Sequence, residues 1–102
     1  MRIIKRSTLA AYWSRNPGVE TALRHWHSVC KRVTWRSFVD VRSTFPHADL
    51  VTVRSGKVVV VFNIGGNKCR LITAIHYNLE LVFTLMVLSH PQYDQGRWKE
   101  VL

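Results

Sequence analysis

Phe62-Asn63-Ile64-Gly65-Gly66-Asn67-Lys68-Cys69-Arg70-Leu71 is the stretch that decides the fold of this 102-residue chain. Its two glycines tolerate the positive φ angles of a tight hairpin turn, and apolar runs lie on both sides of them. The stretch therefore predicts two adjacent antiparallel strands. Strand alternation further predicts that Lys68 and Arg70 project from one face, about 7 Å apart, and Cys69 from the other.

The region around this hairpin has the pattern of a β-meander. Residues 50–53, 57–63, 68–77 and 80–88 are rich in Val, Ile, Leu, Phe and Thr, and short turn sequences separate them. The pattern predicts four antiparallel strands. The almost continuous apolar runs 58–62 and 81–88 indicate central strands that are partly covered on both faces.

The N-terminal half has the longer period of helices. Residues 1–4 are suited to an opening strand, and a first helix is expected from Ser7 or Thr8 to about residue 15. Apolar residues recur at helical spacing over 19–33, which predicts a second helix with Asn16 as its N-cap and Pro17 in its first position. A short third helix is expected within 34–46, and the tail 91–102 is expected to return across the surface with one helical turn around Trp98.

These expectations combine into one α+β domain over 1–102, with two to three N-terminal helices packed on an antiparallel sheet of four to five strands. The apolar fraction of 47% fits such a globular domain. The four tryptophans lie mostly on apolar stripes and are predicted to be core residues. No apolar run is long enough to span a bilayer, and the two cysteines lack metal-site or redox spacing, so a soluble cytoplasmic protein with free thiols is expected.

The charge of the chain is strongly positive. Fifteen Lys and Arg against six Asp and Glu give a net charge of +9, of which +7 belongs to residues 1–36. Such an excess in a small domain indicates a polyanionic partner, either a nucleic acid or an acidic protein. Charge alone does not distinguish RNA from DNA.

Two motifs together resemble a known family. Residues 62–72, followed by Ser89-His90-Pro91-Gln92-Tyr93-Asp94, are similar to the HigB group of bacterial toxins in the RelE superfamily. The resemblance covers nearly the whole chain. It implies a RelE-like fold, a ribosome-dependent endoribonuclease that cleaves translated mRNA, and inactivation by a HigA-type helix-turn-helix antitoxin. Cys69 departs from the pattern, because many relatives carry Tyr between the Lys and the Arg.

RNA cleavage through the 2′-hydroxyl needs cations for the phosphate and groups that exchange protons. Lys68 and Arg70 are the candidates for phosphate binding and transition-state stabilisation. His90 is the candidate general acid or base. Tyr93 is expected either to stack on a base or to donate a proton, and Asp94 either to orient a neighbour or to cap the final turn.

Six further side chains are candidates for RNA contacts elsewhere on the molecule, namely Arg54, Lys57, Asn67, Arg24, Lys31 and Arg32. The glycine pair is interpreted as a turn rather than as a phosphate-binding loop, because no helix N-terminus follows it. The histidines lack metal-ligand spacing, so neither a metal nor a cofactor is expected.

Two other functions remain open. A ParE-type gyrase inhibitor shares this fold without cleaving RNA, and a non-catalytic RNA-binding module would use the same charge. The combination of His90 and Tyr93 with the two cations favours the nuclease.

Overall fold

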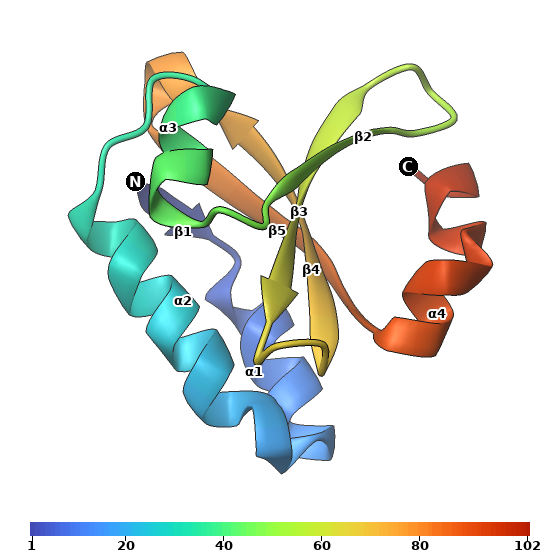
Figure 1. Ribbon diagram of the computed structural model, residues 1–102. Coiled ribbons are helices and arrows are strands. Elements are labelled where there is room, and N and C mark those ends of the chain that lie inside the picture. The colour runs from blue at the N-terminus through green and yellow to red at the C-terminus, as the bar shows by residue number, and fades with distance from the viewer.

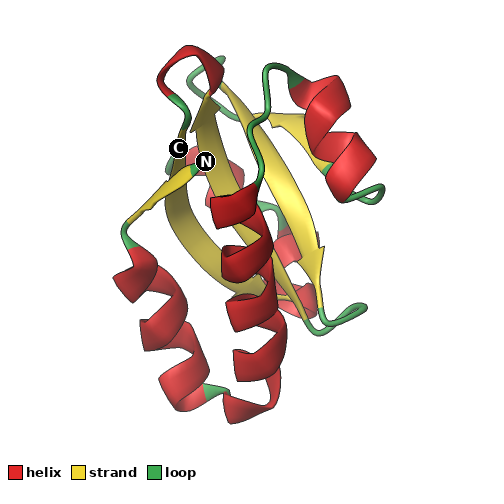
Figure 2. Ribbon diagram, turned by 90° about the vertical axis from the view of Figure 1, so that its left-hand side faces the viewer, coloured by secondary structure: helices red, strands yellow, loops and turns green.

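A mixed five-stranded sheet with helices on both faces forms the protein (Figures 1 and 2). The computed structural model describes residues 1–102. The strands are β1 (Arg2–Ile4), β2 (Asp49–Thr52), β3 (Val58–Ile64), β4 (Cys69–His76) and β5 (Leu81–Ser89). The helices are α1 (Arg6–Arg15), α2 (Glu20–Arg32), α3 (Phe38–Thr44) and α4 (His90–Gln95), with 3₁₀ turns at Pro17–Val19, Tyr77–Leu79 and Arg97–Glu100.

The predicted α+β class and the antiparallel meander are confirmed. Strands β2 to β5 pair in sequence order, and the sheet order is β1-β5-β4-β3-β2. The fifth strand differs from the expectation of an antiparallel sheet, because β1 pairs in parallel with β5. The Thr84 hydroxyl, which donates to the carbonyls of Ile4 and Lys5 at 3.0 and 2.7 Å, secures this pair at the point where the chain turns into α1.

The helix starts differ in detail from their predictions. Helix α1 begins at Arg6 after Lys5, which has a φ of 75°, and the hydroxyl of Thr8 donates to the Thr84 carbonyl instead of capping the helix. Pro17 opens a separate 3₁₀ turn, so the second helix proper starts only at Glu20, and Asn16 makes no side-chain cap. None of the helices has the length and apolarity needed to cross a membrane.

The larger core lies between the sheet and the N-terminal helices. Figure 1 shows α1 and α2 side by side along one face of the sheet. Trp26, Trp35, Phe45 and Phe62 form an aromatic cluster there, with ring centroids 5.3 to 6.1 Å apart. The apolar stripe of α2 and alternate residues of β3 and β4 supply this core, as the periodicity predicted.

A smaller core covers the opposite face. The chain after β5 folds back as α4 and a 3₁₀ turn and buries Trp98 against Val59, Val61 and Ile72 (Figure 1). This tail contains more helix than the single turn predicted. Coverage on both sides explains why β3 and the first half of β4 are apolar at nearly every position, since both faces of these strands are buried.

Candidate active site

The start of β4, the end of β5 and the start of α4 meet at the tail-covered face of the sheet. Cys69 pairs with Ser89 in the β4–β5 ladder, and α4 begins at the next residue. Ser89 and Gln92 form a capping box, in which each side chain bonds the other's backbone N–H at 3.3 and 3.0 Å. This cap fixes the direction in which α4 leaves the sheet, and with it the positions of His90 and Tyr93.

Arg70 is a buried cation, with 8% of its surface exposed. Its Nη2 donates to the side-chain oxygen of Asn67 at 3.1 Å, while Nη1 is buried and has no acceptor. A buried guanidinium without a carboxylate is unfavourable unless something else compensates its charge. The arrangement is therefore suited to receive an anion.

Tyr93 lies between Arg70 and Trp98. The guanidinium carbon of Arg70 is 5.5 Å from the Tyr93 ring centroid, and the Trp98 ring stacks on Tyr93 at 5.3 Å with the two planes 20° apart. Trp98 also donates its indole N–H to the Tyr93 carbonyl at 3.1 Å. Since both the cation and the indole occupy the ring, Tyr93 offers its hydroxyl rather than an open face for base stacking.

The Tyr93 hydroxyl keeps its proton at neutral pH. Burial is the main cause that raises its pKa, Asp49 and Asp94 raise it further, and Arg70 opposes them. The protonated hydroxyl can therefore donate a hydrogen bond, and it belongs to a ring that a buried cation contacts.

His90 and Asp94 form a pair on the exposed side of α4. Nδ1 of His90 lies 2.9 Å from Oδ2 of Asp94, one helical turn away. A carboxylate at Nδ1 favours the tautomer with its proton there and leaves Nε2 free to accept one. Asp94 therefore contacts His90, and the end of α4 is capped by Gly96 with a φ of 75°.

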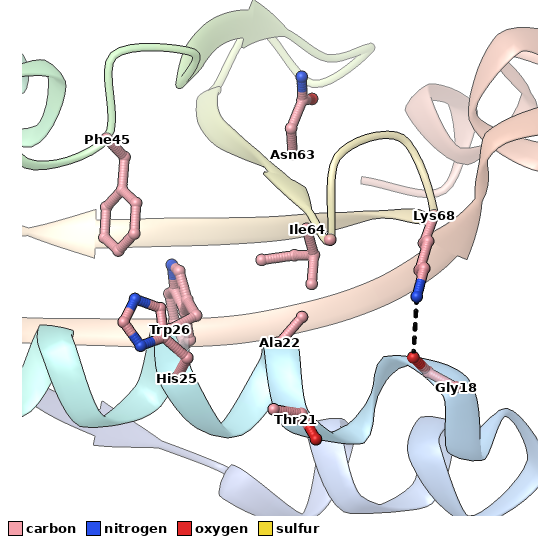
Figure 3. Close-up of a pocket in the computed structure, with 10 residues that line it drawn as sticks. Gly18, Thr21, Ala22, His25, Trp26, Phe45, Asn63, Ile64 and Lys68 are labelled. Atoms are coloured by element: carbon pink, nitrogen blue, oxygen red, sulfur yellow. Dashed lines mark hydrogen bonds between the residues drawn. The ribbon is translucent and has the colours of Figure 1, made fainter.

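Lys68 does not share a face with Arg70, contrary to the prediction. The ladder begins at Cys69, and Lys68 belongs to the preceding turn. Its Nζ bends toward the helical side and donates to the Gly18 carbonyl at 3.3 Å, as Figure 3 shows. Cys69 does lie on the opposite face from Arg70, fully buried in the larger core.

The remaining predicted RNA contacts do not form one surface. Arg24 pairs with Glu20 at 2.7 Å and covers the Trp13 ring, so it has structural partners. Its neighbours on α2, Lys31 and Arg32, also lie on the helical side of the sheet.

The β2–β3 turn holds two more of these candidates at the other edge of the sheet. Arg54 pairs with Glu100 at 3.1 Å, which ties the turn to the tail, whereas Lys57 is exposed. Asn67 is the one candidate of the six that contacts Arg70.

Two residues join the site that the sequence interpretation did not place there. Trp98 was expected only in the core, and Asn63 was not among the candidate site residues. Asn63 lies within β3 directly opposite Arg70, with an exposed side chain. The alternation of Val59, Val61 and Asn63 would have placed it on this face.

Comparisons with known proteins indicate the family of this chain. Residues 19–96 match the family model HigB_toxin, described as the RelE-like toxic component of a toxin-antitoxin system. The chain is also similar to the mRNA interferase HigB of Escherichia coli O6:H1, with 25% identity over 95 residues that cover 93% of this chain and 90% of that protein. The matched region contains every residue of the candidate site except Trp98.

Proposed function

Since this chain belongs to the HigB family of RelE-like toxins, we propose that it is an endoribonuclease that cleaves translated mRNA on the ribosome, with Arg70, His90 and Tyr93 as catalytic residues. Membership of a toxin-antitoxin system implies an antitoxin partner. A HigA-type helix-turn-helix protein is the partner that we propose, and the cytoplasm, where mRNA is translated, is the proposed location.

One observation carries the proposal above the others. Arg70 is buried with its Nη1 unpartnered and contacts the Tyr93 ring, and its strand pairs with the end of β5, which leads directly into the His90–Asp94 pair. A phosphate at the Arg70 guanidinium would supply the missing negative charge. Proton-transfer groups next to a phosphate site are what RNA cleavage requires.

The reaction assigns one task to each group. Nε2 of His90 removes the proton of the 2′-hydroxyl, and the 2′-oxygen forms a bond to phosphorus. Arg70 stabilises the charge on the phosphorane oxygens. The bond from phosphorus to the 5′-oxygen breaks, and Tyr93 donates its proton to that oxygen, which leaves a 2′,3′-cyclic phosphate and a 5′-hydroxyl. Asp94 acts as a positioning residue that holds His90.

Primer extension on an mRNA translated in vitro tests this assignment. We expect new 5′ ends with the wild-type protein and none with Arg70→Met or His90→Ala. His76→Ala is the matched control, because His76 is an exposed histidine at the far end of β4. New ends that persist unchanged in the first two variants would refute the catalytic assignment.

The same assay separates the two rival functions. A gyrase inhibitor of the ParE type would produce no new 5′ ends but would trap cleaved DNA in a gyrase assay. A non-catalytic RNA-binding module would produce neither. The His90–Asp94 pair favours the nuclease, because simple binding of phosphates needs no oriented proton acceptor.

A further inference from the structure

A groove on the helical side of the β3–β4 turn contains Lys68 but no part of the Arg70 guanidinium (Figure 3). It has a volume of about 550 Å³, within the range of pockets that hold small ligands. Its walls come from the start of α2, from Phe45 after α3 and from the turn between β3 and β4. None of the proposed catalytic residues Arg70, His90 and Tyr93 lines this groove.

Several polar side chains that line the groove can donate hydrogen bonds to a ligand. Thr21, His25, Trp26 and Lys68 are among the lining residues, and the lining contains no Asp or Glu. Lys68 is exposed, and one hydrogen bond to a backbone carbonyl is its only polar contact. The indole N–H of Trp26 is buried and has no partner. An electronegative ligand would therefore find free donor capacity on Lys68, whereas the Trp26 N–H is too buried for direct contact.

Aromatic rings and apolar side chains also line the groove. His25, Trp26 and Phe45 present aromatic rings, and Ala22 and Ile64 lie between them and the turn (Figure 3). Aromatic and imidazole rings are the surfaces on which unpaired bases stack in single-stranded RNA recognition. One planar ring with an attached anion fits this lining better than an extended polar chain would.

The groove is adjacent to the candidate active site across the tip of the β3–β4 hairpin. Asn67 contacts Arg70 on one side, and the next residue, Lys68, lies in the groove on the other. Gly65 makes this turn with a φ of +61°, and a Cβ on it would come within 3.1 Å of the Lys68 side chain and 3.5 Å of Ala22. A strand of RNA that passes over Gly65 and Gly66 would meet both sides.

We propose that this groove binds one nucleotide that flanks the cleaved bond, with its base against His25 and Phe45 and its phosphate on Lys68. This inference rests on the proposed function, and it gives the groove the task of selecting where the RNA is cut. Lys68 is then a phosphate contact outside the reacting centre. This role agrees with the position of Lys68, which lies in the groove on the helical side of the sheet, while Arg70 lies on the opposite face.

Titration with nucleoside 5′-monophosphates tests the groove without any cleavage, since these probes contain no phosphodiester. The indole N–H of Trp26 in ¹H–¹⁵N spectra reports the groove, and that of Trp98 reports the Arg70–Tyr93 site. We expect the Trp26 signal to shift and to saturate with at least one of the four nucleotides. Lys68→Met should weaken this binding about tenfold, the equivalent of one charge-assisted hydrogen bond.

Arg36→Met is the matched control, because it removes one exposed positive charge away from the groove. Equal weakening by Arg36→Met and Lys68→Met would overturn the proposal, as would a Trp26 signal that no nucleotide moves. A hexaglutamate peptide that shifts Trp26 where nucleotides do not would assign the groove to an acidic protein partner instead. A response of Trp98 alone would support the phosphate site and reject the groove.

Cleavage maps give a second and separate measurement. In a translating extract, His25→Ala and Lys68→Met should redistribute the cut sites along one mRNA, whereas Arg36→Met should give the wild-type pattern. If Lys68→Met lowers cleavage equally at every site, Lys68 serves the reaction itself and the selection role is wrong. Absence of all cleavage by the wild type would refute the nuclease, while the titration would still decide whether the groove binds nucleotides.

Discussion

Replacement of Arg70 by Met should make the protein more stable and inactive at the same time. The substitution removes the hydrogen bond to Asn67, which contributes about 1.5–3 kcal/mol as a bond of a charged group, and a contact with the Tyr93 ring of about 1–2 kcal/mol. It also removes the cost of burying a guanidinium whose Nη1 has no acceptor, which is several kcal/mol. We expect the relieved burial cost to exceed these two losses slightly, so that the free energy of unfolding rises by about 1 kcal/mol.

A domain of this size converts such a gain into a melting temperature about 4–8 °C higher. Urea unfolding followed by tryptophan fluorescence measures the free energy directly, and primer extension measures cleavage, which should fall by about 10²–10³-fold. Arg70→Lys is the control, because it keeps a buried charge but loses the planar guanidinium over Tyr93. It should be inactive without being stabilised.

A loss of more than about 1 kcal/mol in Arg70→Met would refute this reasoning. Arg70 would then support α4 through its contacts with Asn67 and Tyr93, and its burial would need no anion. Full cleavage by a correctly folded Arg70→Met variant would refute the catalytic role independently of stability.

Three further outcomes follow from the same geometry. Tyr93→Phe keeps the stack with Trp98, so its unfolding free energy should stay within about 0.5 kcal/mol of wild type, while single-turnover cleavage falls by about 10²–10⁴-fold. Asp94→Ala removes the exposed His90–Asp94 pair and should lower the free energy of unfolding in urea by less than about 1 kcal/mol. In ¹⁵N spectra the His90 ring proton should be redistributed between Nδ1 and Nε2, and cleavage should fall about tenfold. Burial raises the pKa of Cys69 from 9.0 to about 11, so the folded state favours the protonated thiol. The resulting contribution to the free energy of unfolding is complete below pH 9 and is lost as the pH rises through 11. The total loss is about 3 kcal/mol. Urea midpoints measured over that range should therefore fall less steeply in Cys69→Ala than in wild type, and identical slopes would contradict the assignment.

The hairpin and the meander could be predicted because their signal is local. The Gly65-Gly66 turn and the period of the flanking strands depend on residues next to one another in the chain. Lys68 shows the limit of this reasoning, since alternation holds only within the hydrogen-bonded ladder. The ladder begins one residue later, at Cys69 opposite Ile64, and Lys68 is free to bend toward Gly18.

The packing of the tail could not be predicted from periodicity. Arginine is rarely buried, so no pattern in the neighbouring sequence indicated that the Arg70 side chain would be buried. Its burial depends on Tyr93 and Trp98, which return to the sheet from the end of the chain. The double motif identified Arg70, His90 and Tyr93 as neighbours, but the stack that closes the Tyr93 ring to bases required the coordinates.

The parallel pair of β1 and β5 also determines when this toxin becomes complete. Its hydrogen bonds join residues up to 80 positions apart, and such distant contacts form late because the intervening chain must be closed first. During synthesis the chain emerges from its N-terminus, so β1 is exposed long before β5, His90 and Tyr93 exist. A nascent chain therefore carries Arg70 without the tyrosine and histidine that would act with it. Vectorial synthesis delays the proposed activity until the last helix has left the ribosome that made it.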